Sequence, residues 1–167
     1  MKRVLWLIIA LLLATGAWWL HGILFPSDET AIRRILHKAA EDASAKSQEG
    51  PLDKLSAINR LIGACTADVE ISLRLPGTSL PAIQGRDQLR EAVGAWRGLA
   101  EGSHIDLIDL AVSVDPNQSQ ATAQFIARSR LDRRSDQMVQ EFKVTLNRSE
   151  GRWKIRQVEP LVSLRME

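Results

Sequence analysis

An apolar run near the N-terminus constrains this chain more than any other feature. Residues 4–25 (VLWLIIALLLATGAWWLHGILF) contain no Asp, Glu, Lys or Arg, and Lys2 and Arg3 stand directly before them. At a rise of ~1.5 Å per residue, a helix of this length crosses the ~30 Å hydrocarbon core of a bilayer. Basic residues before a span favour a cytoplasmic N-terminus. The sequence therefore predicts a single-pass anchor over residues 1–27 in the cell inner membrane, with the following domain in the periplasm or otherwise outside the cytoplasm.

A cleavable signal peptide is the alternative for this segment. Thr15-Gly16-Ala17 loosely offers the small residues that precede a cleavage site. Cleavage there would leave Trp18, Trp19 and several further large apolar residues at a new N-terminus. We therefore prefer an uncleaved anchor.

Residues 28–167 are long enough for one domain with its own core. Lys2 and Arg3 account for the whole net charge of +2, so the charge of the domain is balanced and no nucleic-acid partner is expected. Cys65 is the single cysteine, which excludes an intrachain disulfide and a cysteine-rich metal site. We interpret it as a small buried side chain.

Apolar residues recur with helical spacing in three segments of the domain. The first stripe begins after the capping residue Ser27, the second ends at Gly63, and the third begins near Gly85. The three stripes contain Ile32, Ile35, Leu36, Ala39 and Ala43; then Leu52, Leu55, Ile58, Leu61 and Ile62; then Leu89, Ala92, Val93, Trp96 and Ala100. Three amphipathic helices are predicted, each with its stripe toward a core.

Alternating apolar and polar residues predict the strands. One strand covers residues 69–75, and four more follow residue 103, with turns at 115–117, 132–135 and 147–151. The apolar parity changes near Leu107-Ile108, which predicts a β-bulge there. The expected fold class is α+β: an antiparallel sheet of about four to five strands on about three helices.

Three short segments in this order resemble the nuclear transport factor 2-like, or SnoaL-like, superfamily. They are CTADVEISL at 65–73, IQGRDQLREAV at 83–93 and GRWKIRQV at 151–158. The resemblance implies a cone-shaped curved sheet wrapped around helices, with an apolar pocket inside. This frame hosts isomerases, dehydratases, cyclases and binding proteins, so the fold does not decide the function.

Strand parity predicts which side chains line the pocket. The apolar tracks of the late strands contain Phe125, Phe142 and Trp153, and the polar residues on the same tracks are Ser129, Gln140 and Gln157. None of these polar groups titrates near neutral pH, which counts against acid–base catalysis. Asp68 resembles the aspartate that family members place at the pocket mouth, although a turn residue is the simpler interpretation.

His104 and Asp106 form the one pair that invites a catalytic interpretation. They alternate with Ile105 and Leu107, so we expect them on the solvent side of their strand. No catalytic residue is identified, and neither a metal nor a cofactor is expected.

The charge of the domain is unevenly distributed along the sequence. A basic segment lies between residues 128 and 156, and by parity its cations project away from the apolar tracks. Candidate partner-binding residues are Arg128, Arg130, Lys143, Lys154 and Arg156. Such a face docks an acidic partner or anionic lipid head groups, or is simply a solvated surface with cross-strand charge pairs.

Three functions follow as hypotheses. The preferred one is a membrane-anchored exported binding or assembly module, with a protein partner or a second copy of the chain. A small pocket enzyme of the isomerase or dehydratase type and a carrier of a small apolar ligand are the alternatives.

Overall fold

The computed structural model describes residues 27–75, 78–79, 81–117, 119–131 and 134–161. The predicted anchor segment 4–25 lies outside these ranges. Among the described helices, none has the length and apolar character that crossing a bilayer requires.

Three helices form as the apolar stripes predict: α2 (Asp28–Ala43), α3 (Pro51–Gly63) and α4 (Gly85–Leu99). Ser27 caps α2, because its Oγ accepts a hydrogen bond from the backbone N–H of Thr30 at 3.3 Å. Pro51 begins α3, where its missing N–H costs no helical hydrogen bond. The glycine that opens α4, Gly85, has φ of +74°, a conformation that other residues rarely adopt.

Within the described ranges, eight strands alternate with or follow these helices. They are β1 (Cys65–Ile71), β2 (Arg74–Leu75), β3 (Thr78–Ser79), β4 (Ile83–Gln84), β5 (Ser103–Val114), β6 (Gln120–Leu131), β7 (Arg134–Ser149) and β8 (Arg152–Pro160). Six of them form one sheet in the order β4-β1-β8-β7-β6-β5, while β2 and β3 form a separate pair.

The sheet is mixed, so the prediction of an antiparallel sheet of four to five strands is wrong. β1 pairs with β8 in parallel, whereas the other neighbours run antiparallel. Parallel neighbours need a long connection, and here everything between Ile71 and Arg152 provides it. Alternation within one strand predicts which residues share a face but not the direction of the neighbouring strand.

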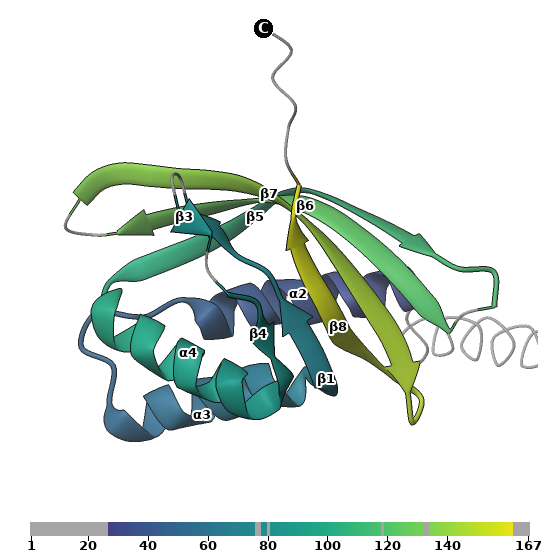
Figure 1. Cartoon of the computed structure of the whole chain (residues 1–167), viewed down its shortest axis with the longest axis horizontal. Coiled ribbons are helices and arrows are strands. Elements are labelled where there is room, and N and C mark those ends of the chain that lie inside the picture. Colours follow the sequence, from purple (N-terminus) through teal and green to yellow (C-terminus); the bar gives the residue numbers. More distant parts are fainter. Residues whose placement is uncertain (1–26, 76–77, 80, 118, 132–133, 162–167) are drawn as a thin grey trace, which may run out of the picture.

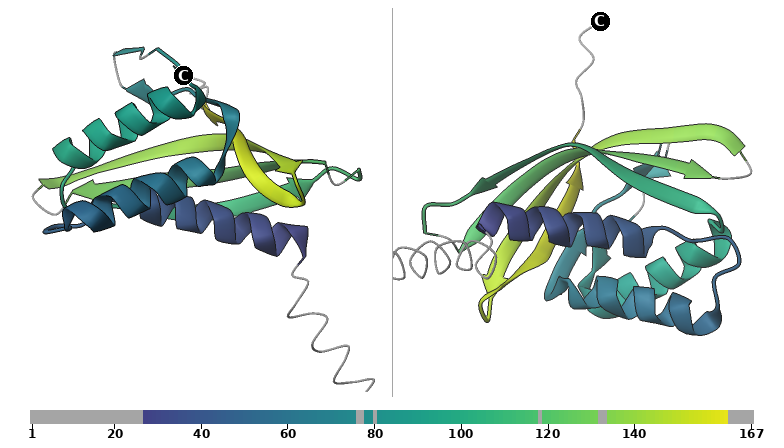
Figure 2. Two further views of the ribbon diagram at one scale, coloured as in Figure 1. Left: turned by 90° about the horizontal axis from the view of Figure 1, so that it is seen from below. Right: turned by 180° about the vertical axis from the view of Figure 1, so that it is seen from behind.

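The curved sheet holds the three described helices on its concave side (Figures 1 and 2). α2 lies against β5, α3 packs beside α2, and α4 packs against α3 and β1. Buried apolar side chains from the helices and from the inner face of the sheet form one core: Ile32, Leu36, Ile58, Ile62, Cys65, Val69, Leu89, Ala121, Ala123, Phe125, Val144, Leu146, Trp153 and Ile155. The opposite, convex face of the sheet carries no helix of the described chain.

Register shifts interrupt several of the strand pairs, and two of them bear on the predicted site residues. The register of β5 against β6 shifts between Ile108 and Ala111, and Asp109 has φ of +54°. The predicted bulge near Leu107-Ile108 is therefore confirmed, displaced by about one residue. A second shift, which the sequence analysis did not predict, lies in β8 between Ile155 and Gln157. A bulge reverses which residues face the core, so it matters for every site residue that follows it.

Cys65 is buried at the start of β1, as its interpretation as a core side chain requires. Its Sγ lies 3.4 Å from the carbonyl oxygen of Leu61, to which it donates. Burial raises the pKa of the thiol to about 11, so the thiolate is scarce at neutral pH. The residue has the character of a small structural side chain.

Candidate functional site

The inner face of the sheet brings together five of the seven predicted pocket residues. Phe125 and Phe142 are cross-strand partners whose ring centroids lie 6.1 Å apart. Gln140 stands opposite Ala127 and Ser129 stands opposite Met138, both in register with the phenylalanines. Trp153 is buried on β8. The residues that share this face are Phe125, Ser129, Gln140, Phe142 and Trp153.

Gln157 does not belong to the inner face, so its predicted direction is wrong. It pairs with Thr145, which alternates with the buried residues Val144 and Leu146 and therefore lies on the outer face. The bulge after Ile155 inserts one residue and reverses the parity. Gln157 instead donates a hydrogen bond to Glu159 at 2.8 Å.

Asp68 also lies away from the interior. Its side chain is 67% exposed and forms an ion pair with Arg156, one of the predicted partner-binding cations. Asp68 was expected at the pocket mouth and Arg156 on the partner-binding face, but the two form an ion pair with each other across the parallel strands β1 and β8.

The inner face offers apolar contact with a few neutral polar groups. The Oγ atom of Ser129 is buried and has no hydrogen-bond partner among the described residues. Arg148, opposite Trp153, is the charged group at the rim, and it pairs with Asp28 of α2 at 3.3 Å. The predicted pocket residues on this face are mainly apolar, and they provide no paired acid and base.

His104 and Asp106 lie on the solvent side of β5, as expected. His104 Nε2 is 2.9 Å from one carboxylate oxygen of Asp106, and Arg130 donates to the other at 2.7 Å. A carboxylate held between an imidazole and a guanidinium on an open sheet surface has the character of a surface network.

Among the described residues, acids of neighbouring strands stand opposite most of the predicted partner-binding cations. Asp106 faces Arg128 across the strands and binds Arg130, while Glu159 stands opposite Lys143. Lys154 pairs with Asn147 and has no acidic residue opposite it. These acids belong to β5 and to the end of β8, outside residues 128–156, so the charge of the basic segment alone does not include them. The geometry favours a solvated sheet with cross-strand charge pairs.

A different surface stands out at one end of α3 and α4, where large apolar side chains meet solvent. Leu52 is 80% exposed and Leu99 is 86% exposed, and Leu55 and Trp96 are also exposed. We call these four residues the α3–α4 end. The first turns of α3 and the last turn of α4 lie close together here. A Cβ atom added to Gly98 of α4 would lie 3.8 Å from the Nζ atom of Lys54 of α3.

These exposures correct two predicted stripes. Leu52, Leu55 and Trp96 were expected to pack into the core. The buried residues of α3 all come from its second half, namely Ala57, Ile58, Leu61 and Ile62. The first turns of α3 therefore extend past the core, and their leucines have no described partner to bury them.

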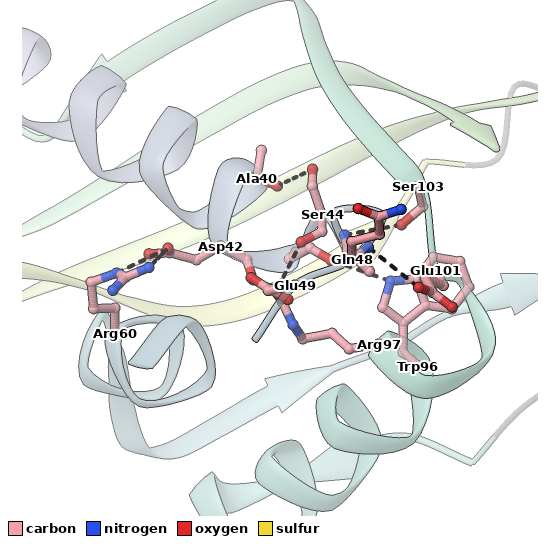
Figure 3. Close-up of polar contacts among 12 residues, drawn as sticks. Ala40, Asp42, Ser44, Gln48, Glu49, Arg60, Trp96, Arg97, Glu101 and Ser103 are labelled. Atoms are coloured by element: carbon pink, nitrogen blue, oxygen red, sulfur yellow. Dashed lines mark hydrogen bonds and ion pairs between the residues drawn. The ribbon is translucent and has the colours of Figure 1, made fainter. Parts of the chain in front are cut away.

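A buried arginine fixes this end of the molecule (Figure 3). Arg97 of α4 donates to the carbonyl oxygen of Ser44 at 2.6 Å, to that of Asp42, and to the carboxylate of Glu49. Its side chain is 1% exposed and that of Glu49 is 14% exposed. The last turn of α2 contains no basic residue, so Arg97 supplies from another helix the cation and the donors that this C-terminus lacks.

Further hydrogen bonds join the same elements. Trp96 Nε1 donates to the carbonyl oxygen of Ala43 at 3.3 Å, and Arg60 of α3 donates twice to Asp42 of α2, at 3.0 and 2.7 Å. The backbone N–H of Gln48 donates to Glu101 at 3.4 Å. The end of α2, the loop after it and the last turn of α4 are thus joined, and Trp96 and Leu99 extend from a fixed scaffold.

The described fold is shared with solved structures of nuclear transport factor 2-like proteins. One is such a protein of unknown function from Pseudomonas putida, with a TM-score of 0.65 and 14% identity, covering 86% of this chain and 92% of that one. Another, with a cystatin-like fold, comes from Novosphingobium aromaticivorans, with a TM-score of 0.64 and 17% identity over 93% and 90%.

A candidate scytalone dehydratase from Novosphingobium aromaticivorans also aligns, with a TM-score of 0.61 and 13% identity over 82% of this chain and 85% of that one. No protein-family model and no curated protein matches the chain. At these identities the likeness establishes the nuclear transport factor 2-like fold, in agreement with the resemblance in sequence. It does not determine the function, which has to be argued from the residues of this chain.

Proposed function

We propose that this chain is a membrane-anchored, exported binding module that docks a protein partner through the α3–α4 end. The observation that carries the proposal is the exposure of Leu52, Leu55, Trp96 and Leu99 on a scaffold fixed by Arg97. Large apolar side chains gathered on a soluble domain mark interaction surfaces. A rigid support lowers the entropy that binding costs.

The charges beside the α3–α4 end indicate the kind of partner. Asp53 follows Leu52 and Glu101 follows Leu99 by two residues, and both acids are exposed. Lys54 lies at the same surface, so its edge carries both signs of charge and suits an apolar protein segment with charged residues on its flanks. The compensated outer face of the sheet makes a weaker docking candidate.

A carrier of a small apolar ligand is the second candidate. The buried Oγ of Ser129 without a partner favours it, because an unpaired buried hydroxyl costs free energy that a ligand acceptor would recover. A pocket enzyme finds less support, since the inner-face residues named above include no paired acid and base.

Charge substitutions on the α3–α4 end test the docking proposal. Leu52→Glu and Leu99→Glu should each reduce in-cell crosslinking to the native partner by at least about tenfold, since a buried unpaired charge is costly in an interface. Both side chains are exposed, so the melting temperature should stay within a few degrees of the wild type. Val139→Glu is the matched control, because Val139 is an exposed apolar residue of β7. Equal crosslinking by all four proteins would reject the surface.

Membrane anchoring has its own test. Because Lys2 and Arg3 precede the apolar run 4–25, alkaline phosphatase fused after Glu167 should be active on the exported side of the membrane. The fused chain should stay in the membrane fraction with its N-terminus intact. An inactive fusion would contradict the exported orientation, and a mature chain that begins near Trp18 would contradict the uncleaved anchor.

A further inference from the structure

A hollow of about 220 Å³ lies between α2 and α3, outside the curved sheet's interior. Its cationic side chains are Arg34, Lys38 and Arg60, and its apolar surface comes from Ile35, Ala39 and Ala64. Asp42 completes the lining. The hollow thus combines positive charge with an apolar surface, an arrangement that differs from both the inner face and the α3–α4 end.

Buried Asp42 holds two of the cations in place. Its side chain is 4% exposed and accepts two hydrogen bonds from Arg60, while Lys38 Nζ lies 3.9 Å away (Figure 3 shows Asp42 and Arg60). Arg34 is exposed and forms no ion pair with any described residue. One guanidinium is therefore available to an anion, beside two cations whose positions are already ordered.

Lys38 also binds an acid at the edge of the hollow. The pKa of Glu41, which is exposed beside Lys38, is lowered first by the hydrogen bond from Lys38, then by the charge of that lysine and, more weakly, by those of Lys46 and Arg60. Lys38 is therefore shared between Glu41 and Asp42, and Arg34 is the cation of the hollow that no described acid pairs with.

We propose that this hollow binds an anionic amphiphile, a molecule with one phosphate or carboxylate and a short apolar segment. The anion would lie against Arg34, Lys38 and Arg60, and the apolar segment against Ile35 and Ala39. The volume is below the ~300–1,000 Å³ of a pocket for a drug-sized molecule, so it suits a head group and a short segment.

Two sources can supply such a molecule. Arg34 lies six residues into α2, about 9 Å along the helix from Asp28 at ~1.5 Å per residue. If the proposed anchor precedes α2, the head groups of anionic phospholipids come within reach of the hollow. A soluble short-chain acid needs no anchor, so this arm of the proposal does not rest on the proposed function.

Calorimetric titration of the full chain, in one neutral detergent throughout, tests the proposal. The probes are dihexanoylphosphatidylglycerol, dihexanoylphosphatidylcholine, hexanoate and inorganic phosphate. The variants are Arg34→Glu, Ala39→Leu to fill the apolar surface, and Arg90→Glu as a matched control on an exposed arginine of α4. Melting curves check that each variant is folded.

We expect the phosphatidylglycerol to bind at least about tenfold more tightly than the phosphatidylcholine. Arg34→Glu and Ala39→Leu should each weaken phosphatidylglycerol binding by at least about tenfold. Arg90→Glu should change it by no more than about twofold. Comparable binding of hexanoate would identify a soluble acid as a source, and its absence would identify the lipid. Equal binding of the two lipids, equal binding of phosphate and phosphatidylglycerol, or wild-type binding by Arg34→Glu would overturn the proposal. A mature chain that begins near Trp18, and so lacks the anchor, would remove the lipid source and leave the hexanoate arm standing.

Discussion

Arg97→Met is expected to lower the free energy of unfolding by about 3–5 kcal/mol, because it removes one partner of a buried ion pair. Glu49 would keep its charge at 14% exposure, and the carbonyl groups of Asp42 and Ser44 would lose their donors. Methionine retains much of the volume, so the loss reports hydrogen bonds and charge instead of a cavity. Thermal and denaturant unfolding of the full chain, followed by circular dichroism, measure it.

Arg90→Met serves as the control on the same helix. Arg90 is exposed and its ion pair with Asp87, at 3.6 Å, is also exposed, so this change should cost less than about 1 kcal/mol. Glu49→Gln should cost less than Arg97→Met, because the amide still accepts from Arg97. Equal stability of the Arg97 and Arg90 variants would show that the buried arginine does not hold the end of α2.

The helices were predictable because their information is local. Ser27, Pro51 and Gly85 are residue types that commonly stand where a helix begins, and the spacing of the apolar residues predicts the helical segments that follow them. The partners of Arg97 were not predictable, because they come from the end of α2 and the loop after it, about fifty residues earlier. One signal did exist: the last turn of α2 contains Glu41 and Asp42 and no base, an arrangement that a cation from another element can stabilise.

The inner face was predictable up to the point where a strand departs from strict alternation. Phe125, Phe142 and Trp153 follow period two, and the structure places them on the inner face. Gln157 continues the same parity in the sequence, but the bulge after Ile155 turns Val158 inward instead. The apolar character of Val158 was the local hint, and a bulge of one residue is otherwise hard to recognise without the partner strand.

The charge patterns failed as predictors of a surface for a related reason. A run of basic residues describes one stretch of chain, whereas the field of a sheet depends on every strand beside it. Asp68 and Asp106 lie on β1 and β5, and each meets an arginine of another strand. The candidate docking surface arose instead from residues expected in the core, since amphipathic spacing cannot say how much of a helix its partners cover.

Trp153→Ala is expected to destabilise the protein by about 3–5 kcal/mol, the usual cost of truncating a large buried aromatic side chain. Trp153 is buried on β8 and its Nε1 donates to Asp28 at 3.0 Å, so the substitution also removes a link between the sheet and the first turn of α2. Arg148 packs over the same ring, 5.7 Å from its centroid, and pairs with Asp28. A fall in melting temperature of roughly 10 °C should follow for a domain of this size.

Trp153→Phe separates the two contributions. Phenylalanine keeps most of the apolar burial but donates no hydrogen bond, so this variant should lose about 1–2 kcal/mol, the cost of leaving Asp28 with Arg148 alone. Asp28→Ala, which removes the acceptor itself, should lose at least as much, and the two changes together should cost less than their sum, because both remove the same hydrogen bond. If Trp153→Ala melted within a degree or two of the wild type, the tryptophan could not be part of the core, and the assignment of the inner face through β8 would be wrong.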